Sequence, residues 1–361
     1  MIDKQTAINH TRYKQVTLIE PVPVFPSTRF QGSKLKIANW IWSNIEHLKF
    51  NTALDAFGGT GSVAYMLKKK GKKVIYNDIL KFNWYIGLAL IENDSVFLKP
   101  GDIEFIMKRH KDIKYPCFIA DEFKDIYFTD GENEWLDTVV TNINHLKDLY
   151  KKALAYFALF QSCIAKRPFN LFHRKNLYLR FSDVKRNFGN KTTWDTPFDL
   201  HFKKYIKEAN QAVFSNGKRN KALNLDVFGI KGNFELVYID TPYISKKGVG
   251  VDYLGFYHFL EGLVNYSKWN KMINFKTKHR RLKAQRNPWI DKNQIHSAFD
   301  KLFKKFKNSI LVVSYRSDGI PSIDELIKLL EKYKSDIIVN RKSYKYVLSN
   351  NQSEEVLIVA K

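Results

Sequence analysis

Strand-like and helix-like stretches alternate along the chain from about residue 52 and predict an α/β fold. The apolar run TALDAF (52–57) indicates a strand, the glycines after it a turn, and VAYMLKKKGK (63–72) a helix. The same order returns with KVIYND (73–78) as a strand and FNWYIGLALIEN (82–93) as a helix. Strands that alternate with helices are typical of a parallel sheet.

This pattern breaks between residues 97 and 220, which are mixed, aromatic and basic, with one helix expected over 142–163. The sheet resumes with FELVYID (234–240). Further elements are expected as strands at 309–315, 335–340, 343–349 and 355–360, the last two forming an antiparallel hairpin, and as a helix at 322–333. Residues 1–96 and 221–361 therefore form one predicted α/β domain, interrupted by an insertion at 97–220 and by a second, basic insertion at 245–295.

The composition is that of a globular protein, with 44% hydrophobic residues among 361. No apolar run approaches the roughly 18–20 residues that a membrane span needs. The first residues lack the apolar core of a secretion signal, and the two cysteines, Cys117 and Cys163, fit a reducing cytoplasm. No Cys/His cluster has zinc spacing, so no metal site is expected.

Charge changes the picture more than composition does. Lys and Arg number 60 against 36 Asp and Glu, a net charge of +24, which predicts a polyanionic partner unless it only solvates the surface. Residues 268–286 carry eight Lys and Arg and no acid, and residues 166–191 carry eight against Asp183 alone. Interleaved aromatic residues favour a nucleic-acid surface over a membrane surface. The residues expected to contact bases or phosphates are Arg167, Asn170, Arg174, Asn176, Lys276, Arg280 and Arg281.

The stretch DAFGGTGSVA, which begins at Asp55, places three glycines between a strand and a helix, where the backbone can approach a nucleotide-like ligand: Gly58, Gly59 and Gly61. Asp78 ends the next strand and could accept hydrogen bonds from a ribose. GTGSVA also fits the dinucleotide pattern, so a nicotinamide enzyme or an empty turn stays open. Asp55 favours a cofactor that carries an ammonium group, as S-adenosylmethionine does, over a pyrophosphate.

The sequence DTPY, residues Asp240, Thr241, Pro242 and Tyr243, follows a later strand at the same edge of the sheet. The Asp240 carboxylate and the Thr241 carbonyl, stiffened by Pro242, would suit an amino group with two N–H donors. Tyr243 offers a face on which a base could stack, after that base has left the duplex. The alternative is an ordinary turn with a buried tyrosine.

Taken in order, these motifs resemble those of the DNA adenine-N6 methyltransferases of the D12 class, which include deoxyadenosine methylases and many restriction-system methylases. RFQGSK resembles the motif that borders the methionine part of the cofactor, which implies cofactor contacts for Arg29, Gly32, Ser33 and Lys34. DAFGGTGS resembles the cofactor loop, which Phe57 borders, and YND resembles the ribose-binding position. NLDVF, with Asp226, resembles the motif that contacts the cofactor's adenine, and DTPY resembles the catalytic D-P-P-Y.

Individual roles stay open at three of these positions. Lys34 could be a solvated residue, Asp226 a turn cap, and Phe57 a packing residue. At Thr241 the family usually has Pro, but the main-chain carbonyl is kept, so activity with a looser loop is expected. Asp240 favours adenine over N4-cytosine, an inference from the resemblance.

The resemblance implies a Rossmann-like, S-adenosylmethionine-dependent methyltransferase sheet with a DNA-recognition module inserted between its second and fourth strands. It implies a cytoplasmic monomer that methylates N6 of a flipped adenine at a specific site, paired with a restriction endonuclease without a stable complex. The alternatives are a methyltransferase for N4-cytosine or RNA, an impaired DNA-binding homologue, and a nicotinamide oxidoreductase. The last lacks a catalytic His or Tyr-x-x-x-Lys constellation at the strand ends.

Overall fold

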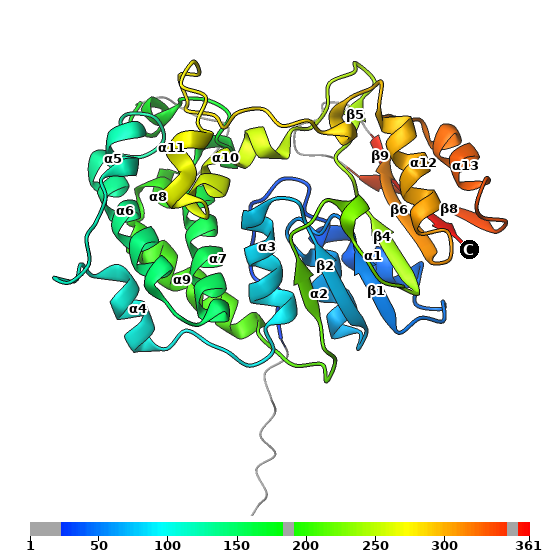
Figure 1. Cartoon of the computed structure of the whole chain (residues 1–361), viewed down its shortest axis with the longest axis horizontal. Coiled ribbons are helices and arrows are strands. Elements are labelled where there is room, and N and C mark those ends of the chain that lie inside the picture. The colour runs from blue at the N-terminus through cyan, green and yellow to red at the C-terminus, as the bar shows by residue number, and fades with distance from the viewer. Residues whose placement is uncertain (1–22, 183–190, 345–352) are drawn as a thin grey trace, which may run out of the picture.

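A seven-stranded sheet forms the centre of one half of the protein in the computed structural model, which describes residues 23–182, 191–344 and 353–361 (Figure 1). The strand order is β3-β2-β1-β4-β6-β9-β8. The bounds are β1 Thr52–Asp55, β2 Lys73–Asn77, β3 Lys221–Leu223, β4 Leu236–Ile239, β6 Ile310–Arg316, β8 Ile337–Tyr344 and β9 Ser353–Ala360. The neighbours from β3 to β6 pair in parallel, and β9 is antiparallel to both β6 and β8. This arrangement confirms the predicted mixed α/β sheet.

The two faces of the sheet are covered by different helices. In β4, Leu236 and Tyr238 pack into one hydrophobic core, and Val237 and Ile239 pack into another, as the alternation of side chains along a strand requires. The first core includes α1 Ala38–Ser43, α2 Ser62–Lys69 and α3 Lys81–Gly87, which continues as a π-helix, η2 Leu88–Glu92. The second core includes α12 Ile295–Lys305 and α13 Ile323–Leu330. All four β4 residues are buried, because both faces of the strand are covered. This explains why its sequence is a continuous apolar run.

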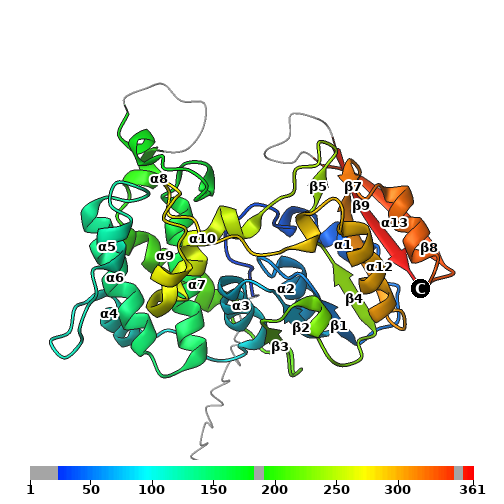
Figure 2. The ribbon, with the colours of Figure 1, turned by 45° about the horizontal axis from the view of Figure 1, so that its top comes forward.

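A helical module lies beside the sheet, at the left in Figures 1 and 2. Its helices are α4 Pro100–Met107, α5 Phe118–Glu122, α6 Asp130–His145, α7 Leu149–Ala165, α8 Lys191–Asp195 and α9 Phe198–Ala212. The single helix predicted over 142–163 is wrong, because the chain turns between α6 and α7. Asp148 starts the second helix by accepting hydrogen bonds from the Tyr150 and Lys151 amides, at 2.8 and 2.9 Å.

The second basic insertion packs against this module and does not form a unit of its own. Its helices are α10 Tyr253–Leu263 and α11 Trp269–Met272. The ring of Phe259 stacks on that of Phe172, with centroids 5.1 Å apart, and Trp269 packs on Phe123 at 4.8 Å. Figure 2 shows α10 running from the sheet to the helical module. The module is therefore built from two separate segments of the chain that share one aromatic core.

Smaller elements complete the fold. They are the antiparallel pair β5 Ile244–Ser245 and β7 Gly319–Ile320, and the 3-10 helices η1 Leu35–Ile37, η3 Pro168–Asn170, η4 Leu177–Arg180, η5 Val227–Gly229, η6 Tyr266–Lys268 and η7 Pro288–Ile290. The strand β8 is continuous over residues predicted as two strands, and residues 345–352, which include most of the second, lie outside the described part. Over the residues that the structure describes, no helix is both long and apolar enough to cross a membrane.

Candidate active site

Three aspartates meet at the carboxyl edge of the sheet. Asp55 is the last residue of β1, Asp78 follows β2, and Asp240 follows β4. Because β1 pairs in parallel with both β2 and β4, these side chains lie at one edge around a cavity of about 310 Å³. The cavity is also lined by the other residues of the DTPY turn and by parts of several further segments, among them Gly32, Lys34, Phe57, Gly58, Gly59, Asp226, Thr241, Pro242, Tyr243, Arg281 and 284–290.

The glycine loop is tied to the end of β2. A Cβ at Gly58 would overlap the Tyr76 ring, so only glycine fits there. Gly61 has φ of 75° where α2 begins, a conformation that glycine adopts at low cost. The Gly59 amide donates a 2.9 Å hydrogen bond to Asp78 Oδ2, and the Tyr76 hydroxyl donates to the Gly59 carbonyl at 2.7 Å. The loop is thus held in one shape against Asp78.

The cavity is electrostatically suited to a cation at Asp55. Burial raises the pKa of Asp55 to about 8, and the nearby Asp240 charge adds to the increase. Within the described part of the protein, Asp55 Oδ1 is buried and has no hydrogen-bond partner. Burial also raises the pKa of Asp78, to about 6, although amide donors from Leu80 and Gly59 oppose it. An ammonium group beside Asp55 would offset the cost of ionising it.

The N-terminal motif reaches the cavity with only some of its residues. Gly32 and Lys34 line it. Ser33 stands behind the lining and accepts a 3.3 Å hydrogen bond from Thr60 of the glycine loop. Arg29 is exposed and lies outside the lining, and its guanidinium donates to Thr193 at 3.5 Å. The structure thus places Arg29 against the helical module and not in the predicted cofactor site.

Lys34 is buried, which overturns its interpretation as a solvated residue. Its side chain is 6% exposed, and its Nζ lies 3.2 Å from Asp240 Oδ1 and 3.0 Å from Glu355 Oε1. Burial raises the pKa of Asp240, and the Lys34 charge opposes that increase. Glu355 could not be predicted from the sequence, because nothing in the strand EVLIVA indicates that it pairs with Lys34, which is far away along the chain.

The rest of the DTPY turn is enclosed. Tyr243 is 6% exposed, lines the cavity and packs edge-to-face on Tyr315, with centroids 6.2 Å apart. The Arg316 guanidinium lies over the Tyr243 ring, 5.3 Å from its centroid. Thr241 is buried, and its hydroxyl has no hydrogen-bond partner among the described residues. The turn is therefore built into the cavity wall, with the tyrosine ring held in place from two sides.

Asp226 and Phe57 each line the cavity and also have the structural role that was the alternative for them, a turn cap for Asp226 and packing for Phe57. Asp226 lines the cavity, and its side chain also caps η5 by accepting a 2.8 Å hydrogen bond from the Phe228 amide. Phe57 lines the cavity and packs edge-to-face on Trp289 at 5.0 Å. The segment 284–290, part of the second basic insertion, supplies this wall. Sequence reasoning missed it, since its basic charge pointed to phosphate contacts.

Two of the predicted DNA-reading residues are inside the helical module. Arg167 is 1% exposed, and its guanidinium donates to the carbonyls of Tyr127, Leu171 and Arg174 at 3.1–3.2 Å. It also donates to Oδ1 of Asn176, which is itself buried. The prediction that Arg167 and Asn176 face DNA is therefore wrong. Their polar groups are buried and bond to each other and to backbone carbonyls, which stabilises the loop of residues 168–175.

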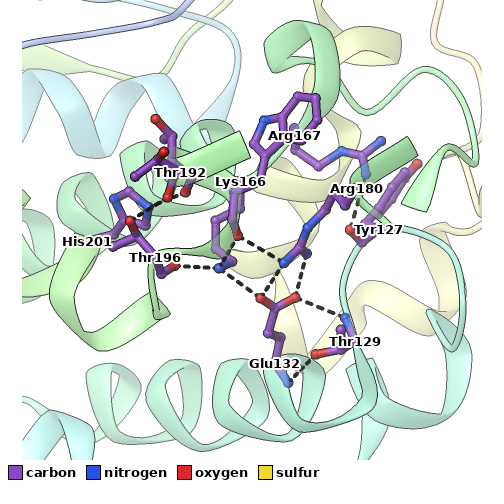
Figure 3. Close-up of polar contacts among 11 residues, drawn as sticks. Tyr127, Thr129, Glu132, Lys166, Arg167, Arg180, Thr192, Thr196 and His201 are labelled. Carbon is purple, nitrogen blue, oxygen red and sulfur yellow. Dashed lines mark hydrogen bonds and ion pairs between the residues drawn. The ribbon is translucent and has the colours of Figure 1, made fainter. Parts of the chain in front are cut away.

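Other basic residues of the same stretch form an internal ion cluster (Figure 3). Glu132 pairs with Lys166 at 2.9 Å and accepts two hydrogen bonds from Arg180, at 2.6 and 2.8 Å. Lys166 and Arg180 also donate to the carbonyl of Trp194. The cluster joins α6, α7 and the segments on either side of residues 183–190, which lie outside the described part.

The surface of the module keeps a smaller set of basic and aromatic residues. Arg174 and Lys276 are exposed and Asn170 is half-buried. Arg280 lies 3.6 Å from Glu122, and Arg281 pairs with Asp252 and lines the cavity. Exposed aromatic rings accompany them: Phe169, Tyr178, Phe181 and Phe275.

Comparison with known proteins identifies the class to which this geometry belongs. The family of D12 class N6 adenine-specific DNA methyltransferases matches residues 30–328. A type II methyltransferase, M2.HphI of Haemophilus parahaemolyticus, is 30% identical over 341 residues, 92% of this chain and 96% of that protein. M.NlaIII of Neisseria lactamica is 23% identical over 85% of this chain and 89% of its own. M.FokI of Planomicrobium okeanokoites is 26% identical, and this chain matches 47% of its length.

The chain belongs to the D12 class N6 adenine-specific DNA methyltransferases. It is an enzyme of site-specific adenine methylation in DNA, and the predicted resemblance is confirmed. The family assignment favours methyl transfer over the nicotinamide chemistry that GTGSVA left open.

Proposed function

We propose that the cavity at the carboxyl edge binds S-adenosylmethionine and one adenine flipped out of double-stranded DNA, and that the DTPY turn directs methyl transfer to N6. The observation that supports this most is the convergence of Asp55, Asp78 and Asp240 on one cavity, with a buried Asp55 oxygen that lacks a partner among the described residues. A cavity with few, convergent polar groups on an apolar wall is typical of a site for such ligands.

The residues present fit the cofactor. Asp55 would accept hydrogen bonds from its ammonium group, and Asp78 from its ribose hydroxyls. Phe57 and Asp226 would border its adenine, on the apolar wall that Trp289 supports. When bound, S-adenosylmethionine supplies an electrophilic methyl group, and the electron pair of the broken C–S bond stays on sulfur.

The target amine would lie at the other end of the cavity. Asp240 and the Thr241 carbonyl would accept the two N6 hydrogens, which turns the nitrogen lone pair toward the methyl group. The Asp240 charge would also stabilise the positive charge that develops on nitrogen before one N6 proton is lost. The ring of Tyr243 would stack on the flipped base.

We further propose that the exposed basic and aromatic residues of the helical module contact the duplex, with Arg174, Asn170 and Lys276 among them. The names of the type II methyltransferase relatives support a role in modification beside a restriction endonuclease. We propose in addition that the protein acts as a cytoplasmic monomer without a stable nuclease complex.

The direct test is to incubate the purified protein with methyl-labelled S-adenosylmethionine and either duplex DNA or RNA, and then to analyse nucleosides and map the modified sites. We expect N6-methyladenine at one short sequence. Label in N4-methylcytosine, label in RNA alone, or no transfer to DNA would each contradict the proposal.

A further inference from the structure

Glu355 belongs to β9, two strands away from β4, yet it meets the DTPY turn through Lys34. The Lys34 ammonium lies 3.0 Å from Glu355 Oε1 and 3.2 Å from Asp240 Oδ1. The intervening strand β6 contributes Ser314, whose hydroxyl donates to the same Oε1 of Glu355. Four segments far apart in the sequence thus form one connected group beneath the cavity.

This group is almost closed to water, so its charges are not screened. The Glu355 side chain is 0% exposed, that of Lys34 is 6% exposed and that of Asp240 is 16% exposed. A buried carboxylate is costly unless it is paired and hydrogen-bonded. Of the two carboxylates that share Lys34, only Asp240 lines the cavity. Glu355 therefore has no direct route to a ligand in the cavity and acts through Lys34.

We propose that Glu355 is a positioning residue for methyl transfer, which holds the Lys34 ammonium in place and takes part of its charge, so that Asp240 meets the target amine as an incompletely neutralised carboxylate. This inference rests on the proposed role of Asp240. Lys34 alone would stabilise the Asp240 carboxylate, but it would also weaken it as an acceptor. Glu355 draws the ammonium toward β9 and leaves Asp240 better able to accept the N6 hydrogens.

Opposite signs follow for the two neighbours of Asp240. A nearby negative charge disfavours ionisation of a carboxyl group, and a nearby positive charge favours it. Removal of the Glu355 charge should therefore shift the acid limb of the methylation rate to lower pH, and removal of the Lys34 charge should shift it to higher pH.

Other ionisable groups lie near Asp240, and their titration could also affect the pH dependence of the methylation rate. They are Asp55 from β1, Tyr238 from β4, Tyr243 from the turn and Tyr253 from α10, and Arg316 from β6 lies one step further away, over the Tyr243 ring. Burial raises the pKa of each of these tyrosines, so they stay neutral through the assay range. Asp55 titrates near the same range, and the assay is therefore run at saturating S-adenosylmethionine, with cofactor affinity measured separately at each pH.

The test is a single-turnover methylation rate measured against pH for the parent, for Glu355→Gln and for Glu354→Gln. Glu354 is the matched control, since it is the next residue on β9 and pairs with Arg341 at the surface. We expect Glu355→Gln to move the acid limb down by about one pH unit, and Glu354→Gln to leave it in place. An unchanged limb in Glu355→Gln, or a shift to higher pH, overturns the inference.

Two further variants keep the inference falsifiable if Glu355→Gln folds poorly. Lys34→Met should move the limb to higher pH, and Ser314→Ala should do so by less, because Glu355 then depends more on Lys34. A purely structural role would lower the melting temperature or the active fraction but leave the limb unchanged in all three. Absence of methyl transfer by the parent would instead contradict the proposed function, so the two failures are distinguishable.

Discussion

Asp240 is the residue on which the proposed chemistry depends most. Asp240→Ala removes the carboxylate that would accept an N6 hydrogen, while Lys34 keeps Glu355 as a partner. We expect the single-turnover methylation rate to fall at least about 10²-fold and S-adenosylmethionine affinity, measured by calorimetry, to stay near that of the parent. Asp78→Ala is the matched comparison and should weaken cofactor binding instead. Methylation at the parental rate by Asp240→Ala would refute the assigned role.

Thr241 differs from the proline usual in the family, and we expect a proline to be tolerated at this position. Its hydroxyl is buried and has no partner within the described residues, so its loss costs no hydrogen bond there. Thr241→Pro keeps the carbonyl and stiffens the turn, and we expect the parental methylation rate with equal or higher thermal stability. A tenfold lower rate with a normal melting curve would show that this turn needs a conformation closed to proline.

Among individual residues, those that lie at the carboxyl end of a strand could be predicted from the sequence. Asp55, Asp78 and Asp240 could be grouped because parallel strands end at one edge. The meeting of Lys34 with Glu355 could not be foreseen, since it depends on strand order and on β9 inserting antiparallel next to β6. The burial of Arg167 was equally hidden, because residue type and local charge do not tell inside from outside.

At the scale of elements, Arg167 and Arg174 make a matched pair within one loop. Arg167→Ala leaves the carbonyls of Tyr127 and Leu171 without their donor in a buried place, and should lower the free energy of unfolding by about 2–4 kcal/mol. Arg174→Ala removes an exposed charge and should leave stability within about 0.5 kcal/mol, while it weakens DNA binding. Denaturant unfolding and DNA titration of both variants check this. The opposite pattern would restore Arg167 as a DNA-contacting residue.

Elements with a strong local signal were predicted well, and weak or composite ones were not. β4 and β6 are apolar runs, which predict buried strands. The helix α13 begins with a capping box at Ser322 and Glu325, a start signal that is visible in the sequence. β3 has three residues and one buried side chain, too little to distinguish it from a loop. The break between α6 and α7 depends on the cap at Asp148, inside a stretch that otherwise looks helical.

Across the whole molecule, the net charge of +24 predicts binding that depends on salt. Neutralising three exposed lysines of the second basic segment, Lys271, Lys276 and Lys278, should weaken binding to all duplexes alike. The slope of log affinity against log salt should fall by about one for each phosphate that the variant no longer binds. Three exposed lysines outside the helical module, Lys304 and Lys305 in α12 and Lys307 just after it, serve as the control set. Equal slopes for both sets of variants would show that the lysines of the second basic insertion only solvate the surface and do not contact phosphates.

The net charge of the whole molecule predicted a polyanionic partner, which agrees with a DNA methyltransferase, but it did not show which basic residues are at the surface. Lys166 and Arg180 neutralise Glu132 inside the module, and Arg281 neutralises Asp252 beside the cavity. The second basic segment also supplies a cavity wall at 284–290. Whether a basic residue lies in an internal ion pair, in the cavity wall or at the surface depends on packing between segments that are distant in the sequence. Local sequence patterns do not reveal such contacts.

The aromatic core shared by the two segments of the helical module limits how new specificities could be engineered or inherited. A chimaera that exchanged only residues 97–220 with a relative would set foreign rings against Phe259 and Trp269, whose present partners, Phe172 and Phe123, would be gone. Such a hybrid should aggregate or melt early, whereas one that also carried 253–282 should keep its core. With DNA recognition assigned to the helical module, as we propose, specificity is transferable only when both segments are exchanged together, and an exchange of 97–220 alone should yield a protein that folds poorly.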